Sequence, residues 1–454
     1  MTAPPVVKNQ TVTIVIDDLS VNGEGIGRHD GYTLFVNSAL PGETVEARVI
    51  KTGRDYGYAK LINIIDASPD RREPDCPSQN SCGGCGLRHL NYESQLKYKT
   101  GRVADALSRI AGERDLIVRG CVGMDSPYYY RNKAQFPAGI IDGGPAFGFY
   151  ARRSHRLTPV VGCLINDPVN DIIIAKTLEY MAENGVSAYD EASHSGTVRH
   201  LVTRVGKKSG EIIVCLCINK KYLPYSGALI EKLTTIPGVV GVAASINTKK
   251  TNVIMGGKTE FIWGKKYISD SLIGTEFQIS PSSFYQVNPV QTEIVYKTAI
   301  NFSDPKPGDT VVDAYCGIGT IALCIAGRVN RVYGIESSAE AVSDARANAK
   351  LNGVTNAEFI HGMAEHALEE LYSSGVSPDI LIADPARRGC DIKLLETIGK
   401  HRPGRMVYIS CDPASFARDV KILRGYGYKL TEVQPVDCFA FSPHVETVAL
   451  LVRD

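Results

Sequence analysis

The feature that most constrains the fold is an alternation of apolar, strand-like runs and helix-like segments that begins after Asn288. The apolar runs end at Asp313, Glu336, Asp384 and Cys411. Strands that alternate with helices predict a doubly wound, Rossmann-like parallel sheet, whose ligand site lies at the carboxyl ends of the strands. Three acidic residues and one cysteine at strand ends therefore form the candidate functional site of this region.

A glycine-containing turn follows the first of these strands and passes through Gly317, Gly319 and Thr320 into a helix-like run. Glycines let the backbone approach a cofactor closely, and the start of a helix supplies free amide donors. The carboxylate of Glu336, at the end of the second strand, can accept both hydroxyls of a ribose. The longer G-x-G-x-x-G fingerprint of dinucleotide enzymes is not in register, so S-adenosylmethionine is the better expected ligand.

Cys411 follows the apolar run MVYIS and precedes Asp412 and Pro413, so the chain turns out of a strand at this point. Most buried cysteines are inert small hydrophobic residues. The position at a strand end favours a nucleophile instead, because a thiolate is highly reactive even when only a few per cent of the thiol is ionised near neutral pH.

The N-terminal part has a different pattern. Residues 11–67 contain short alternating apolar runs, separated by turns rich in Gly, Asn, Asp and Pro. They predict a small OB-like β-barrel, a fold that often presents loops to oligonucleotides, although a purely structural barrel is the alternative. Helical spacing follows at 92–110, and a mixed α+β region is expected over about 120–280.

Residues 128–156 combine basic and aromatic side chains, although the whole chain is balanced, with 50 Lys and Arg against 49 Asp and Glu. Cations on phosphates and rings under bases suit unstacked RNA, whereas core aromatics with a solvated basic face are the alternative. The residues concerned are Arg131, Lys133, Arg152, Arg153 and Arg156, with Tyr128, Tyr129, Tyr130, Phe136, Phe147, Phe149 and Tyr150.

Cysteine usage indicates a metal site. The N-terminus has no apolar signal segment and no apolar run is long enough to span a membrane, so we expect a cytosolic protein, in which clustered cysteines are metal-binding or catalytic. Cys76, Cys82 and Cys85 form a C-x5-C-x2-C motif, and Cys163 is the natural fourth ligand. Spacing alone is compatible with zinc as well as with an iron–sulfur cluster.

The segments DAYCGIGT, SSFYQVN, IADPARRG, YISCDPASFARD and HVETVALL resemble the RNA uracil C5 methyltransferases, and the resemblance covers nearly the whole chain. It implies that Cys411 is the nucleophile that adds to carbon 6 of uridine and that Glu446 removes the carbon 5 proton. Phe284 would stack near the target base. The implied contacts of S-adenosylmethionine are Gln286, Asp313, Tyr315, Gly317, Gly319, Thr320, Glu336 and Asp384.

One residue departs from the family pattern, which commonly has Asn after the nucleophilic Cys where this chain has Asp412. An extra negative charge there would disfavour the thiolate. Competing methyltransferase classes fit less well. Cytosine C5 enzymes place a cysteine beside the proline that corresponds to Pro385, and amino-group methylases place an aromatic residue where this chain has Ala386.

The resemblance also bears on the cluster and the substrate. Family members with this cysteine spacing carry a [4Fe-4S] cluster, and the spacing differs from the C-x3-C-x2-C motif of radical methylases, so cofactor cleavage is not expected. The cluster cysteines favour 23S ribosomal RNA as the substrate. A transfer RNA enzyme and a non-catalytic RNA chaperone are the alternatives, and nothing implies an obligate protein partner.

We therefore expect three domains. The N-terminal barrel, which resembles the TRAM domain, is predicted to be an RNA-binding module and to span residues 5–67. A central α+β domain with the cysteine loop comprises 68–90 and 120–280. The methyltransferase domain comprises 91–119 and 281–454, so that the helix at 92–110 belongs with the C-terminal sheet.

Overall fold

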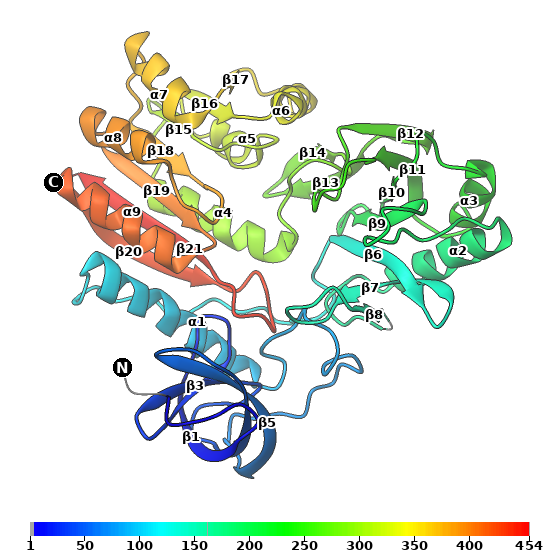
Figure 1. Ribbon diagram of the computed structural model, residues 1–454. Helices are drawn as coiled ribbons and strands as arrows, with labels where there is room; N and C mark the ends of the chain where they lie inside the picture. Colours follow the sequence, from blue (N-terminus) through cyan, green and yellow to red (C-terminus); the bar gives the residue numbers. More distant parts are fainter. Residues whose placement is uncertain (1–3, 161, 454) are drawn as a thin grey trace.

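The computed structural model describes residues 4–160 and 162–453, so Val161 and Asp454 of the predicted domains lie outside the described residues. The chain forms a closed barrel, two seven-stranded sheets and a two-stranded hairpin. In Figure 1 the barrel (blue) lies at the bottom of the view, the C-terminal sheet (yellow to red) at the left and the central region (cyan to green) at the right.

The N-terminal region is a five-stranded closed barrel with the strand order β1-β2-β3-β5-β4. Buried and exposed residues alternate along β1, as expected for a strand with one face in a core. The barrel core contains Leu34, Val36, Val45 and Val49, all fully buried. The strands are β1 (Thr11–Leu19), β2 (Gly25–His29), β3 (Tyr32–Asn37), β4 (Thr44–Thr52) and β5 (Tyr56–Asp66).

The helix α1 (Tyr92–Ala106) continues as a π-helical segment to Ala111, close to the predicted 92–110. The Asn91 side chain caps it by accepting a hydrogen bond from the Ser94 amide at 2.8 Å. Its buried face packs with Leu107 against the helices of the C-terminal sheet.

The central region is built on a mixed sheet with the order β12-β11-β10-β9-β6-β7-β8. The run IIVCLCI forms β10, which is buried along its whole length. The helices α2 (Val169–Glu183) and α3 (Ser226–Leu233) share one core with the sheet. The strands are β6 (Lys133–Ile141), β7 (Gly144–Tyr150), β8 (Leu157–Pro159), β9 (Val198–Val205), β10 (Ile212–Ile218), β11 (Val239–Ile246) and β12 (Lys258–Gly264).

The C-terminal sheet has the order β17-β16-β15-β18-β19-β21-β20. β15 to β19 are parallel, whereas β21 is antiparallel to both of its neighbours. The strands are β15 (Thr310–Asp313), β16 (Arg331–Glu336), β17 (Ala357–His361), β18 (Ile380–Ala383), β19 (Arg405–Ser410), β20 (Tyr428–Val436) and β21 (Glu446–Arg453).

Helices cover both faces of this sheet and create two cores. One core contains residues of α4, α5 and α6, and the other contains residues of α1, α7, α8 and α9. The chain runs from β15 to one side of the sheet and returns to β18 on the other, so the order reverses between these strands. Ligand sites of such sheets lie at this reversal.

The helices of this region are α4 (Pro289–Ser303), α5 (Thr320–Ala326), α6 (Ala339–Leu351), α7 (Ala364–Ser373), α8 (Ile392–His401) and α9 (Pro413–Gly425). A hairpin of β13 (Ile268–Leu272) and β14 (Thr275–Ile279) precedes α4. Within the described residues, none of the helices has the length and apolar character needed to cross a membrane.

Candidate active site and cysteine cavity

The carboxyl ends of β15, β16, β18 and β19 open into one cavity of about 500 Å³, here called the catalytic cavity. Almost all of the side chains predicted as cofactor contacts, nucleophile or base line it, and Gly319 is the exception. Parallel strands bring their ends to the same edge, which explains why residues far apart in sequence meet. Those lining the cavity are Gln286, Asp313, Tyr315, Gly317, Thr320, Glu336, Asp384, Cys411 and Glu446.

The glycine turn shapes one wall of the cavity. Gly317 and Gly319 both have positive φ, at 54° and 84°, which an L side chain adopts rarely. A Cβ at Gly319 would also lie 3.0 Å from the ring of Phe359. The Gly317 amide donates to Glu336 Oε2 at 3.2 Å. Gly319 therefore supports the turn from behind, while Gly317 and Glu336 line the cavity.

Two acidic side chains at the strand ends have pKa values above the usual range of a carboxyl group. Burial raises the pKa of Asp313 to about 7 and that of Asp384 to about 7. Asp384 accepts a hydrogen bond from Gln286 Nε2 at 3.5 Å, but Asp313 Oδ2 is buried without a partner among the described residues. A ligand that brings positive charge and hydrogen-bond donors would satisfy these carboxyls, and S-adenosylmethionine has a sulfonium, an amino group and ribose hydroxyls.

Cys411 lies between the end of β19 and the start of α9. Asp412 is the N-cap of α9, and its carboxylate accepts from the amides of Ala414 at 3.1 Å and Ser415 at 2.9 Å. The positive end of the helix stabilises this charge. Burial, Glu446 and then Asp384 raise the pKa of the Cys411 thiol to about 12, and Asp412 contributes less than each of them.

A second cysteine, Cys316, lines the same cavity. Its side chain is only 3% exposed and packs close to the backbone of Gly334. Burial and the neighbouring Asp313 raise the pKa of Cys316 well above its usual range. Cys411 is half-buried, so of these two thiols it is the one better placed to reach a substrate.

Glu446 is the first residue of β21 and is 4% exposed. Its Oε2 has no hydrogen-bond partner among the described residues. Burial and then Asp384 raise the pKa of Glu446 to about 8, whereas Arg387 lowers it. A carboxyl that titrates close to neutral pH is suited to act as a general base.

The cavity contains functional side chains to which the sequence analysis gave no role. Arg387 Nη2 lies 3.4 Å from His444 Nε2, and both line the cavity. Burial and then Arg387 lower the pKa of His444 to about 4, so this imidazole is neutral and accepts from the guanidinium. Arg387 lies in the motif IADPARRG and His444 in the motif HVETVALL, and these motifs are the sequence signal that could have identified both residues.

Phe284, which was predicted to stack near the target base, also lines the cavity. It is 69% exposed, so its ring is free to contact a base.

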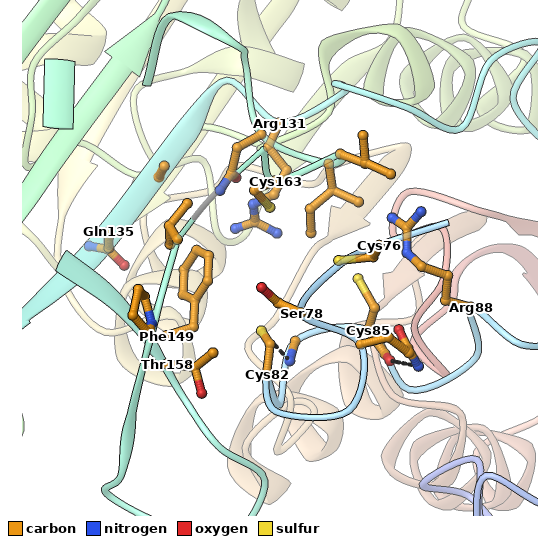
Figure 2. A pocket seen from close by; sticks show the side chains of 18 residues that line it. Cys76, Ser78, Cys82, Cys85, Arg88, Arg131, Gln135, Phe149, Thr158 and Cys163 are labelled. Atoms are coloured by element: carbon orange, nitrogen blue, oxygen red, sulfur yellow. Dashed lines mark hydrogen bonds between the residues drawn. The ribbon is translucent and has the colours of Figure 1, made fainter. Parts of the chain in front are cut away.

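The four predicted metal ligands line a separate cavity of about 240 Å³, here called the cysteine cavity. Figure 2 shows their thiols around one space, with Cys163 on a different segment from Cys76, Cys82 and Cys85. The Thr158 hydroxyl donates to the Ser81 carbonyl at 2.9 Å and joins the two segments.

Electrostatics in the cysteine cavity disfavour free thiolates. Burial raises the pKa of Cys82 and Cys163, and it raises that of Cys85 to about 11, with further contributions from the neighbouring cysteines. In the part of the chain that the structure describes, no three His, Cys, Asp or Glu side chains form a group that could hold a metal ion. The predicted ligands thus gather around a cavity, but they do not form a preorganised site for a single ion.

The predicted basic and aromatic RNA surface at 128–156 is only partly exposed. Tyr130, Phe136 and Phe147 are buried in core clusters. Burial and then the neighbouring Arg204 lower the pKa of Lys133 to about 7. The prediction of an RNA-facing role is wrong for these aromatic rings, because strand alternation turns Phe136 and Phe147 toward the core, and Tyr130 packs in a cluster with Met124 and Phe441.

Two other basic residues of this segment contact the barrel instead. The Arg152 guanidinium donates to Asn37 Oδ1, and Arg153 donates to Glu24 Oε1 at 2.6 Å. The Arg153 guanidinium also lies 4.6 Å from the centre of the Tyr58 ring. These contacts link the central sheet to the barrel, so the two regions present a joint surface.

The parallel sheet, the glycine turn and the acidic strand ends define the class of S-adenosylmethionine-dependent methyltransferases. The model of the tRNA (uracil-5-)-methyltransferase family matches residues 207–454, and that of the TRAM domain matches residues 5–62. The chain belongs to this RNA uracil-5-methyltransferase family, which confirms the predicted resemblance and excludes the alternative of a non-catalytic chaperone.

Relatives match along nearly the full length. An uncharacterized RNA methyltransferase of Halalkalibacterium halodurans is 46% identical over 98% of each chain, and one of Listeria innocua is 43% identical over 98% of each chain. The solved structure of the Pyrococcus abyssi tRNA (uracil-54, C5)-methyltransferase, in complex with S-adenosyl-L-homocysteine, has a TM-score of 0.79 and 27% identity. The match covers 97% of this chain and 100% of the Pyrococcus abyssi chain.

Proposed function

We propose that this enzyme methylates carbon 5 of a uridine in 23S ribosomal RNA through a covalent adduct with Cys411. One observation carries the proposal: Cys411 and Glu446 line the same cavity as the predicted cofactor contacts. A nucleophile, a base and a methyl donor are the three components that this reaction needs, and a single cavity can bring them to one base.

The proposed reaction begins with addition of Cys411 to the uracil ring. The Cys411 thiolate forms a bond to carbon 6, and the electron pair of the carbon 5–carbon 6 double bond makes carbon 5 nucleophilic. S-adenosylmethionine, held by the predicted cofactor contacts, would supply the methyl group that carbon 5 takes and would leave as S-adenosylhomocysteine. Glu446 then removes the carbon 5 proton, the double bond re-forms and the Cys411 sulfur leaves carbon 6.

Two groups near Cys411 would adjust its reactivity. Arg387 lowers the pKa of both Cys411 and Glu446, because a nearby positive charge favours their ionised forms. When bound, the cofactor would place a further positive charge near the carboxyls of Asp384 and Glu446. We infer that both effects bring Glu446 into its ionised form before it acts as the base.

We also propose that Cys76, Cys82, Cys85 and Cys163 bind a [4Fe-4S] cluster. A zinc ion needs four sulfur atoms at about 2.3 Å from one point, whereas a four-iron cluster distributes four thiolates over its separate iron atoms. All four cysteines line one cavity, so a cluster in that cavity could bind each of them. The cluster would supply a structural link between two segments.

The proposed division of labour follows the predicted domains. Residues 5–67 would bind RNA, and residues 281–454 with α1 would perform the chemistry. Twelve free cysteines and an RNA substrate fit a cytosolic enzyme.

Transfer RNA is the second candidate substrate. The description of the matching family names tRNA, and the Pyrococcus abyssi enzyme is a tRNA (uracil-54, C5)-methyltransferase. The experiment that separates the candidates is to map 5-methyluridine in ribosomal and transfer RNA from a strain that lacks the gene. Loss from 23S RNA, restored by the wild-type gene and not by Cys411→Ala, supports the first candidate. Loss only from transfer RNA supports the second, and loss from neither contradicts both.

A further inference from the structure

A third cavity of about 450 Å³ lies on the central sheet. It follows the other two along one segment: Arg131 lines the catalytic and cysteine cavities, Gln135 lines the cysteine cavity and the third one, and Pro137 lines the third. At roughly 3.3 Å per extended residue, Arg131 and Pro137 lie at most about 20 Å apart. A single nucleic acid strand could therefore reach from the catalytic cavity to the third one.

The walls of the third cavity carry flat rings. Phe149, Tyr150 and Tyr189 line it together with the imidazoles of His155 and His200. The rings of Tyr150 and His155 lie 5.4 Å apart, and Tyr150 is 38% exposed. Rings of this kind, open to solvent on one side, form stacking platforms for unpaired bases.

His200 supplies an unmet polar group. Its Nδ1 is buried and has no hydrogen-bond partner among the described residues. Burial and then Arg199 lower the pKa of His200 to about 4, so the ring is neutral. A neutral imidazole has one donor and one acceptor nitrogen, and a buried nitrogen without a partner calls for a bound ligand or water.

The cavity has charges of both signs: Glu191 lines it and lies 2.9 Å from His155 Nδ1, and a buried arginine lies under it. Arg199 is 4% exposed and donates to the carbonyls of Asn247 at 3.0 Å, Lys249 at 2.7 Å and Thr251 at 2.8 Å. These three hydrogen bonds fix the segment that closes one side of the cavity. Lys250, on that segment, also lines the cavity.

We propose that the third cavity binds one unstacked base of the substrate RNA, from a nucleotide other than the methylated uridine. Ring faces, mixed hydrogen-bonding groups and cations together are the chemistry that recognises an unpaired base with its phosphate. The inference rests on the proposed function, because it requires RNA as the substrate. A free nucleotide shares this chemistry and is separated from an RNA base by the experiment below.

The test is a double-mutant cycle between protein and RNA. The probe is a fluorescein-labelled RNA oligonucleotide around the mapped target uridine, made with an abasic site at each neighbouring position in turn. One position should weaken binding to the wild type by about 5- to 150-fold, the range for loss of one stacked base. Tyr150→Ala and His200→Ala should weaken binding of the intact RNA and abolish the penalty at that position alone.

Tyr222→Ala is the matched control, because Tyr222 is a 72% exposed tyrosine of the same region that does not line the cavity. It should leave every penalty unchanged. The proposal is overturned if both cavity variants keep all abasic penalties, or if nucleoside monophosphates bind the wild type as tightly as the RNA and through Tyr150. If the wild-type protein methylates RNA and the variants bind RNA normally, only this inference is refuted. If the wild-type protein methylates no RNA, the proposed function is refuted as well.

Discussion

The catalytic and cysteine cavities differ in how the fold constructs them. Residues of the first cavity come from the ends of adjacent strands, so the register of one sheet fixes their positions. The four cysteines of the second come from two irregular segments that no common strand pair aligns. The difference teaches that motifs at strand ends specify both the members and the geometry of a site, whereas cysteine spacing specifies only the members.

One segment contacts both cavities. Phe439 and His444 line the catalytic cavity, while Phe441 packs with Cys85 and lies under the Arg88 guanidinium at 3.9 Å. A fully buried ion pair, Lys99 Nζ to Asp437 Oδ1 at 2.5 Å, ties the start of this segment to α1. The segment 437–445 therefore contacts residues of both cavities.

The largest expected effect distinguishes two cysteines of the catalytic cavity. Cys411→Ala should abolish methylation, since no other group can form the bond to carbon 6. Cys316→Ala, at the matched position on the cavity wall, should retain activity. Transfer of labelled methyl groups to RNA measures both, and equal loss in the two variants would contradict the assignment of Cys411.

The second prediction concerns the cysteine cavity. Protein purified without oxygen should be brown and contain iron and sulfide in equal amounts. Cys163→Ser should lose this iron, whereas Cys324→Ser, which changes a half-buried cysteine outside the cavity, should keep it. Stoichiometric zinc in the wild type, or full iron content in Cys163→Ser, would refute the cluster.

The third prediction addresses the segment between the cavities. Lys99→Met leaves the carboxylate of Asp437 buried without its charged partner, and should lower the free energy of unfolding by about 3–5 kcal/mol. Lys97→Met, on the exposed face of the same helix, should change it by less than about 0.5 kcal/mol. Urea denaturation measures both, and similar values for the two variants would mean that the ion pair is not structurally important.

The smallest effect is a pH dependence of the catalytic cavity. Glu446 must be ionised to remove a proton, and its pKa is raised to about 8, so the rate at which the methylated adduct resolves should increase about tenfold per pH unit below that value. Arg387→Met removes a charge that lowers this pKa and should shift the midpoint upward. Arg388→Met, an exposed neighbour outside the cavity, should not. The same pH midpoint in Arg387→Met and in the wild type would contradict the electrostatic account.

Sequence patterns predicted much of the catalytic cavity, because Asp313, Glu336 and Asp384 each end an apolar run and such runs become parallel strands. They did not assign Arg387 or His444, whose importance depends on a contact between two distant segments. The pairing of parallel strands and the order reversal between β15 and β18 likewise arise from tertiary packing.

The N-terminal half was harder to predict. Alternation predicted the barrel strands over residues 11–67. The exposure of residues 128–156 could not be deduced, because basic and aromatic composition does not tell which strand face meets a core. Phe136 and Phe147 are consequently buried, while Tyr150 is exposed.

The most direct test of the central claim is the fate of the covalent adduct in Glu446→Gln. This variant keeps the Cys411 thiol but lacks the base that takes the carbon 5 proton, so a methylated enzyme–RNA adduct should accumulate and survive a denaturing gel. Wild-type enzyme should accumulate an adduct only with 5-fluorouridine at the target, and this adduct carries fluorine in place of the carbon 5 proton, since fluorine cannot leave as a proton does. Normal turnover by Glu446→Gln, or an adduct formed by Cys411→Ala, would contradict the account.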